Sequence, residues 1–251
     1  MLIAGIDLAW GDKNGDGLCL VDYQPAAGRR MAHARVLAHS HVFGDEALLG
    51  ALQDAAGDGP AFLAFDAPLV CVNSTGRRPV DAAVSAAFRA QHAGCYPVNT
   101  RLAPRPLRLA ARLSEAHGYS LNPAAEGATA ARRAAEVFPH PAIVRFLGLS
   151  KILEYKRKSG RPRAHSDAEF GRLQRGLGEL LTTHFPWLEP APGTVALLSA
   201  PWSKPVEDQL DALVCALIAL WHVHNLGGRS EIFGDVATGF VLVPAAGSHQ
   251  L

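Results

Sequence analysis

The chain has 251 residues, of which 49% are hydrophobic and 19% are charged, and its formal net charge is +1. This length allows one large domain or two small ones, and the near-neutral charge argues against a dedicated, strongly basic DNA-binding protein. The four cysteines form no C-x-x-C pair, which disfavours a zinc site built from close pairs and is typical of free thiols in a reducing cytoplasm.

Two segments bear on membrane targeting. The amino-terminal region has no cluster of basic residues, and Asp7 interrupts its only apolar stretch, so no signal peptide is expected. The longest apolar run, Ala212–Trp221, is too short to span a bilayer. We therefore expect a cytoplasmic protein without membrane association, whose oligomeric state the sequence leaves open.

The first part of the chain alternates short apolar runs with turns. Strands are predicted over Leu2–Ala9, Gly17–Tyr23, Arg35–Val42 and residues 61–66. The turn signal Asn14-Gly15 predicts that the first two strands form an antiparallel hairpin. Leucine spacing over residues 45–56 predicts an amphipathic helix before the fourth strand.

Residues 71–133 are punctuated by prolines and predict a largely helical insertion, with short helices over Val80–Ala93 and Leu107–His117. A fifth strand is expected over Ala134–Phe138, closed by a rigid turn at Pro139-His140-Pro141. The remaining predictions are a basic loop over Lys151–Arg163, a helix over Ser166–His184 with Ser166 as its N-cap, a helix over Val206–His224, and a hairpin over about residues 231–244. We expect one α/β domain over residues 1–251.

Carboxylates stand at the ends of predicted strands and in the last helix. Asp7 and Asp66 lie in strands that would otherwise be fully apolar. Asp208 and Asp211 are three residues apart and share one face of the helix, on which no basic residue is expected to neutralise them. Carboxylates that converge from separate elements repel one another unless cations lie among them, and Mg²⁺ or Mn²⁺ prefers such oxygen ligands.

Two such ions can activate a water and stabilise the leaving oxygen of a phosphodiester. RNase H-like nucleases use this chemistry, and the predicted order of strands and helices is also theirs. Simpler roles remain open at this point. Asp7 could hold the turn that follows it, and Asp208 could stabilise the start of its helix through the helix dipole.

Several motifs follow one another in a characteristic order. They are Gly5-Ile6-Asp7-x-Ala9-Trp10, Phe65-Asp66-Ala67-Pro68-Leu69, Asn73-x-x-Gly76-x-Arg78, Arg89-x-x-His92-x-Gly94-x-Tyr96-Pro97-x-Asn99, Glu136-Val137-Phe138-Pro139-His140-Pro141 and Asp208-x-x-Asp211-Ala212-Leu213. Together they resemble the domain-of-unknown-function family number 429, whose members are predicted to be RNase H-like nucleases. The resemblance covers nearly the whole chain.

The resemblance implies an α/β fold with an RNase H-like mixed five-stranded sheet, flanking helices and the insertion between the fourth and fifth strands. It implies Asp7 as the central metal ligand, Asp66 as the acid of the second strand, and Asp208 or Asp211 as the helix acid. Many RNase H-like nucleases carry Glu where this chain has Asp66, so Glu136 on the neighbouring strand is an alternative source of that acid.

A further set of polar residues could hold a substrate phosphate if the insertion covers the acids. The candidates are Arg77, Arg78, Arg89, His92, Tyr96, Asn99, His140, Lys156 and Lys158. Arginine suits this role because it offers bidentate donors, and His140 could also move a proton. The alternatives are that the Arg and His side chains pair with Asp81 or Glu115 to hold the insertion together, and that the basic loop is simply solvated.

The leading hypothesis is an Mg²⁺- or Mn²⁺-dependent nuclease or phosphodiesterase that acts on nucleic acid or a nucleotide. Asp7, Asp66, Asp208, Asp211 and Glu136 are its predicted catalytic residues, and the four aspartates are its predicted metal ligands. The alternative is a non-catalytic nucleotide- or RNA-binding module on the same fold. A phosphotransferase related to the actin-like ATPases would need two such cores, and only one first-strand motif is present.

Overall fold

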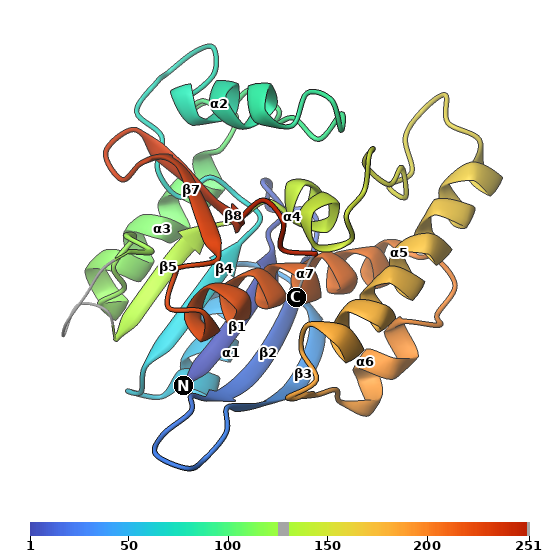
Figure 1. Cartoon of the computed structure of the whole chain (residues 1–251). Coiled ribbons are helices and arrows are strands. Elements are labelled where there is room, and N and C mark those ends of the chain that lie inside the picture. The colour runs from blue at the N-terminus through green and yellow to red at the C-terminus, as the bar shows by residue number, and fades with distance from the viewer. Residues whose placement is uncertain (125–130, 250–251) are drawn as a thin grey trace.

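The computed structural model describes residues 1–124 and 131–249 and shows a mixed α/β chain built around one large sheet (Figure 1). The strands of this sheet are β1 (Leu2–Asp7), β2 (Asp16–Gln24), β3 (His33–Val42), β4 (Ala61–Phe65), β5 (Arg132–Glu136) and β6 (Leu188–Glu189), in the order β5-β4-β1-β2-β3-β6. β2 is antiparallel to β1 and β3, whereas β4 is parallel to β1 and β5.

The prediction of five strands was wrong, because β6 adds a sixth strand at the edge of the sheet. β6 pairs in parallel with β3 through Ala34 and Arg35. It has only two residues, and a run of that length has no alternating pattern that a sequence could reveal.

The helices of the described residues are α1 (Asp45–Ala56), α2 (Pro79–Ala87), α3 (Pro104–His117), α4 (Pro139–Phe146), α5 (Arg163–Thr183), α6 (Pro192–Leu197) and α7 (Lys204–His224). α4 begins where we predicted a rigid turn at Pro139, because proline is favoured at the first position of a helix. Ser166 is buried inside α5, and Pro162 occupies the N-cap position that we assigned to Ser166.

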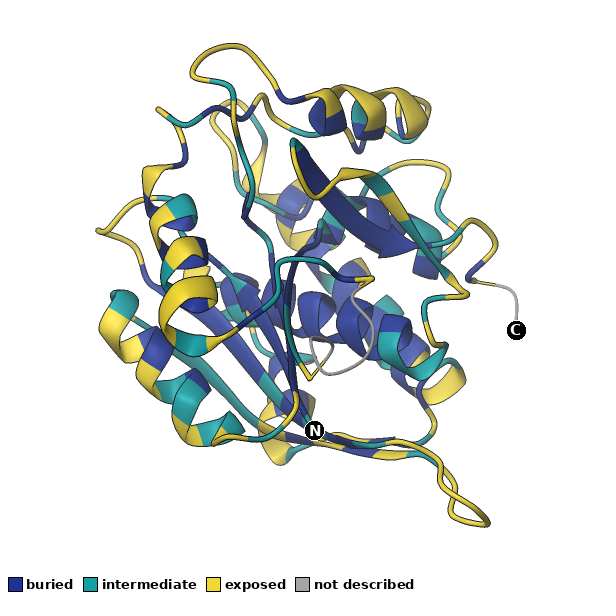
Figure 2. Cartoon of the chain, turned by 90° about the vertical axis from the view of Figure 1, so that its left-hand side faces the viewer, coloured by how far each residue is buried: buried dark blue, intermediate teal, exposed yellow. Residues whose placement is uncertain are grey.

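Helices cover both faces of the sheet. α7 crosses one face, where it contacts β1, β2 and β4, and α4 and α5 join it in a shared core (Figure 1). α1 and α3 pack on the other face with Leu2, Ala4 and Ile6 of β1. Buried residues therefore concentrate in the strands and α7, and the outer surfaces of the peripheral helices are exposed (Figure 2).

Two glycines allow α7 to lie directly on the sheet. A Cβ atom on Gly5 would come within 2.0 Å of the Ala212 carbonyl oxygen, and one on Gly17 would come within 2.0 Å of the Asp208 carbonyl oxygen. No side chain can be accommodated at such distances, so these glycines are required for the close approach of the helix backbone. This contact places the amino-terminal half of α7 over the ends of β1 and β2.

A separate two-stranded sheet follows α7, as predicted for the carboxyl-terminal region. It consists of β7 (Ser230–Asp235) and β8 (Gly239–Pro244), which pair antiparallel. Val241 and Val243 of β8 pack against Val80 and Val84 of α2. The hairpin and α2 therefore lie together beyond the ends of β4 and β5 (Figure 1).

The four cysteines agree with the expectation of free thiols. All four cysteines are free, with Cys19 and Cys215 buried and Cys71 and Cys95 half-buried. In the part of the chain that the structure describes, no helix has the length and apolar character needed to cross a membrane.

We expect Gly5→Ala to lower the free energy of unfolding by about 3 kcal/mol, because the new methyl group would overlap the backbone of α7. Gly11→Ala is the matched control, since a Cβ atom there would meet nothing within 4 Å and should change stability by less than about 0.5 kcal/mol. Urea unfolding of both variants measures the difference. Equal stabilities of the two variants would contradict the close packing of α7 on β1.

Candidate active site

The alternation of side chains along two adjacent parallel strands brings Asp7 and Asp66 together. Ile3 of β1 and Phe62 of β4 both belong to the core beneath α7. Asp7 lies four residues after Ile3, and Asp66 lies four residues after Phe62, so both carboxylates leave the sheet on the α7 side. The Asp66 backbone amide donates to the Ile6 carbonyl at 2.8 Å, which fixes the two strand ends next to each other.

Asp7 and Asp66 line a cavity of about 530 Å³ at these strand ends. Its other lining residues come from the segment after β1, the insertion, the loop before α5 and the start of α4, and include Trp10, His92, Tyr96, His140, Lys156 and Lys158. Val241 of the hairpin closes one side. The insertion thus contributes to the wall of the acidic cavity.

Asp211 lies beside this cavity and is fully buried. The Tyr155 hydroxyl donates to its Oδ1 at 2.6 Å, and Lys156 Nζ forms an ion pair with its Oδ2 at 2.8 Å. Burial raises the pKa of Tyr155, and the nearby Asp211 carboxylate raises it further, which keeps the phenol protonated as a donor. The Asp211 side chain is therefore held by two consecutive residues of one loop.

Asp208 has two partners of its own. Lys204 Nζ lies 2.6 Å from Asp208 Oδ1, and His41 Nε2 lies 3.1 Å from Oδ2. Our expectation that no basic residue on this helix neutralises the acids was wrong, because Lys204 precedes Asp208 by one helical turn. Residues four apart are neighbours on a helix surface, and this spacing could have revealed the pair.

Asp7 and Asp66 differ from the two helix acids in their contacts. In the described parts of the chain, neither carboxylate accepts a hydrogen bond, and no cationic nitrogen lies within 4 Å of its oxygens. Burial raises the pKa of Asp7 well above its ordinary value, and Asp211, Asp66 and Asp208 raise it further against the opposing effect of Lys156. Burial and Asp211 also raise the pKa of Asp66 to about 7, although Lys156 and Lys204 oppose this shift.

Glu136 lines the same cavity as Asp7 and Asp66, but its carboxylate belongs to a separate ion-pair cluster. It pairs with Phe65 in the sheet register, and Phe65 belongs to the core on the α1 side. Its side chain therefore leaves the sheet on the face opposite to Asp7 and Asp66. Arg78 donates to both Glu136 oxygens, at 2.6 and 2.7 Å, and to Asp81 at 2.8 Å.

This second cluster fastens the insertion to the sheet. Asp81 also accepts from the backbone amide of Val98 at 3.0 Å, and Arg78 donates to the Val70 carbonyl at 2.9 Å. Burial raises the pKa of Glu136 to about 7, although Arg78 favours its ionised form. The pairing of Arg78 with Asp81 agrees with the alternative in which such residues hold the insertion together.

The other predicted substrate-binding residues divide into two groups. His92, Tyr96, His140, Lys156 and Lys158 line the cavity with Arg78, whereas Arg77, Arg89 and Asn99 do not. Asn99 instead organises its own loop, since its side chain donates to the Gly76 carbonyl and accepts from the amides of Arg101 and Leu102. Arg77 and Arg89 are exposed.

His140 stacks on the ring of Tyr155, with 5.6 Å between the ring centroids. Burial lowers the pKa of His140 to about 3, and Lys156 contributes to the same shift. The imidazole is therefore neutral at physiological pH, so it cannot act there as a cationic ligand of phosphate.

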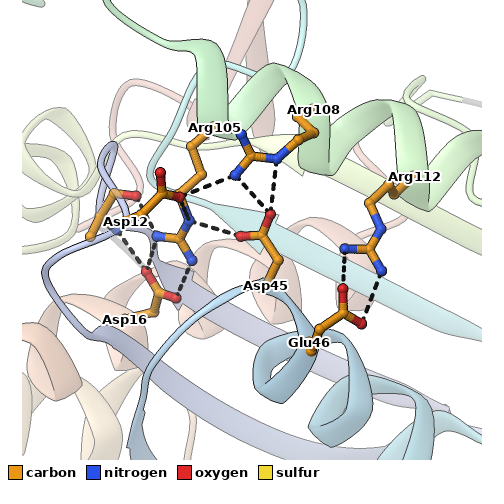
Figure 3. A network of polar contacts seen from close by, with 8 residues as sticks. Asp12, Asp16, Asp45, Glu46, Arg105, Arg108 and Arg112 are labelled. Atoms are coloured by element: carbon orange, nitrogen blue, oxygen red, sulfur yellow. Dashed lines mark hydrogen bonds and ion pairs between the residues drawn. The ribbon is translucent and has the colours of Figure 1, made fainter.

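A network of arginines that sequence reasoning missed holds the chain just after Asp7 (Figure 3). Arg105 of α3 is buried and donates to both oxygens of Asp16, at 2.7 and 2.8 Å, and to the Ala9 carbonyl at 2.6 Å. Asp16 in turn accepts from the Ala9 amide at 2.9 Å. The pair therefore fixes the backbone two residues beyond Asp7.

The rest of this network ties α3 to α1. Arg105 and Arg108 both bind Asp45, Arg108 also reaches Asp12, and Arg112 binds Glu46 (Figure 3). The three arginines recur along one side of α3, and this spacing was the available signal in the sequence.

The donor chemistry of the site suits a hard divalent cation only in part. Carboxylate oxygens are the right ligands for Mg²⁺ or Mn²⁺, and Asp7 and Asp66 present them to the cavity without a direct partner among the described residues. Asp208 and Asp211 are occupied by lysines. Within residues 1–124 and 131–249, no group of three or more His, Cys, Asp or Glu side chains is arranged to hold a metal ion.

A family model described as "Protein of unknown function (DUF429)" matches residues 5–238 of the chain. The chain belongs to this family. The match extends from β1 to the turn of the final hairpin, and it therefore includes Asp7, Asp66, Lys156 and Asp211. Comparisons with curated proteins and with solved structures find no match.

We expect Arg78→Met to destabilise the fold by about 3–5 kcal/mol at pH 8, because it leaves the buried Asp81 and Glu136 without their cation. The loss should be smaller at pH 5. Without the arginine, the already raised folded-state pKa of Glu136 rises further, and protonation then removes its buried charge as the pH falls through that value. Urea unfolding at both pH values measures this dependence.

Arg77→Met is the matched control, since it removes the same charge from the neighbouring exposed position. It should change stability by less than about 0.5 kcal/mol. A pH-independent loss in Arg78→Met, or the same loss in both variants, would show that the buried ion pairs are not the cause.

Proposed function

We propose that this chain is a divalent-metal-dependent phosphodiesterase of the RNase H-like type that acts on nucleic acid or a nucleotide. The observation that carries the proposal is the pair of carboxylates on adjacent parallel strands, Asp7 and Asp66, which face one cavity without a direct partner among the described residues. Two half-buried carboxylates in this position repel each other, and a bound cation relieves that repulsion.

The arrangement of the strands supports the RNase H-like assignment. Three antiparallel strands, β1 to β3, are followed by β4 and β5, which lie parallel to β1 on its other side. This order puts the ends of β1 and β4 side by side at the centre of the sheet. α7, which covers one face of the sheet, contributes the further carboxylates Asp208 and Asp211. Proteins of one fold carry out many different activities, so the proposal rests on Asp7 and Asp66 at the cavity and not on the fold.

Asp7 and Asp66 would hold the ion, with Asp211 as the nearest additional carboxylate. When bound, the ion would polarise the phosphoryl oxygens and lower the pKa of a water. Lys156 and Lys158 would attract the phosphate, because both line the same cavity as the two aspartates. Glu136 is not included among the catalytic residues, since Arg78 occupies both of its oxygens.

The size of the cavity limits the substrate. A volume of about 530 Å³ falls in the range of about 300–1,000 Å³ that encloses small molecules. Tyr96 is 70% exposed at this cavity and offers a flat ring of the kind on which bases stack. We therefore favour a single nucleotide unit, either free or at the end of a single strand, over a continuous duplex.

A second candidate function is metal-independent binding of a nucleotide. It is favoured by the two lysines, Lys156 and Lys204, that already neutralise Asp211 and Asp208. Under this alternative, a phosphate would bind to Lys158 and its neighbours without a divalent ion. The affinity for a nucleotide would then be the same in the presence of a chelator as in the presence of Mn²⁺. This comparison distinguishes the two functions.

We expect Asp7→Asn to abolish Mn²⁺ binding and Mn²⁺-dependent cleavage of a short single-stranded oligonucleotide by the pure protein. The variant should be at least as stable as the wild type, because it removes a buried charge that has no direct partner among the described residues. Calorimetry with MnCl₂, a cleavage assay and urea unfolding measure the three quantities.

Asp54→Asn serves as the control for this experiment, since Asp54 is an exposed carboxylate on α1, away from the cavity. It should leave binding and cleavage unchanged. Unaltered cleavage by the Asp7→Asn protein would refute the proposed hydrolase.

We also expect the affinity for Mn²⁺ to rise between pH 6 and pH 8. The pKa of Asp66 is raised to about 7, so below this pH a proton must leave before the carboxylate can ligate the ion. Affinity should therefore increase at least about tenfold per pH unit below 7. Calorimetry at constant ionic strength tests this, with Asp66→Asn expected to lose the dependence. The same affinity at both pH values would contradict the role of Asp66.

A further inference from the structure

Lys156 occupies an unusual place for a lysine on a loop. Its Nζ lies 2.8 Å from Asp211 Oδ2, and its side chain is only 24% exposed. The same residue lines the cavity with Asp7 and Asp66. The sequence offered it as a candidate to hold a substrate phosphate, and in the structure its ammonium group lies on the Asp211 carboxylate.

Lys156 is also the cation that acts on all three of these acids. Lys204 is engaged by Asp208 and Glu207 at the start of α7. Lys156, by contrast, lowers the pKa of both Asp7 and Asp66 and is paired with Asp211. Although burial disfavours its ammonium form, Asp211, Asp7 and Asp66 hold its pKa well above the ordinary value. One positive charge thus offsets several buried negative ones.

The loop around Lys156 is anchored while the end of its side chain can move. Tyr155 is fully buried and bound to Asp211. Arg161 donates to the carbonyls of Glu154 and Lys156, at 3.1 and 2.8 Å. The backbone is therefore held on both sides of Lys156, and the four-carbon side chain can turn from Asp211 toward the cavity without a loop rearrangement.

We propose that Lys156 is a built-in counter-ion of the carboxylate cluster and competes with a divalent ion for it. An entering ion displaces Nζ from Asp211, which becomes available as a ligand beside Asp7 and Asp66. The released ammonium group then faces the cavity, where it pairs with the phosphate of the substrate. This inference rests on the proposed function, because it takes a divalent ion as the ligand. It adds that the ion replaces the Lys156 ammonium group on Asp211 before that group binds the phosphate.

This exchange makes the ion and the phosphate bind cooperatively. Without a phosphate, the released ammonium group has lost a carboxylate partner, so the ion binds weakly. With a phosphate in the cavity, the ammonium group regains an anionic partner and the ion binds more tightly.

The direct test is calorimetry with MnCl₂ alone on the wild type, Lys156→Gln and Lys158→Gln. Lys156→Gln should bind Mn²⁺ at least about tenfold more tightly than the wild type, because it frees Asp211 and removes the competing charge. Lys158→Gln is the matched control. It removes an equal charge from the same cavity, but Lys158 contacts the Tyr96 hydroxyl at 2.8 Å and, among the described residues, pairs with no carboxylate.

A second measurement uses the wild-type protein and does not depend on the folding of a variant. Acetic anhydride labelling of Lys156, followed by peptide mass spectrometry, should become faster when Mn²⁺ is added, since the ion releases Nζ. Lys158 in the same samples should be labelled at an unchanged rate. Protection of Lys156 that persists at saturating Mn²⁺ would overturn the proposal.

The outcomes separate this inference from the proposed hydrolase. Tighter Mn²⁺ binding by Lys156→Gln, in a protein that cleaves no phosphodiester, would support the exchange and reject the hydrolase. Equal or weaker binding by Lys156→Gln, or the same gain in Lys158→Gln, would reject the exchange whatever the cleavage assay shows. No Mn²⁺ binding in any of the three proteins would reject both.

Discussion

The contact between α7 and the centre of the sheet determines where Asp208 and Asp211 lie relative to the two strand acids. Gly5 and Gly17 leave no side chain beneath the helix, so the backbone of α7 rests directly on β1 and β2. A larger residue at either position would lift the helix and separate Asp208 and Asp211 from the strand ends. The glycines, which carry no chemistry themselves, are therefore as necessary to the carboxylate cluster as the aspartates.

Once this packing has brought the acids together, their charges must be balanced. The chain uses a different cation for each group: Lys204 for Asp208, Lys156 for Asp211, and Arg78 for Glu136 and Asp81. A buried carboxylate without a cation is costly, and the raised pKa of Asp7 and Asp66 reflects this cost at the two strand acids. Asp7 and Asp66 thus differ from the other acids in having no cation paired with them among the described residues, and we expect a ligand to bind at these two residues.

The site was predictable from the sequence to the extent that strand patterns could reveal it. Asp7 and Asp66 interrupt apolar runs, and those runs do form adjacent strands. Glu136 also ends a strand, but its register with Phe65 turns its side chain to the other face, where Arg78 binds it. A sequence shows that a carboxylate ends a strand, whereas the pairing with the neighbouring strand decides which way it points.

The sequence by itself determined the principal strands and the long helices, because the alternation and spacing of apolar residues are local properties of the chain. It also determined membership of the family, through motifs spread from residue 5 to residue 238. Only the tertiary structure decided the ion pairs. Lys156 and Asp211 are 55 residues apart, as Arg105 is far from Asp16, and no periodicity relates such positions. Charge partners at long range are chosen by packing, since the close approach of elements places one side chain within reach of another.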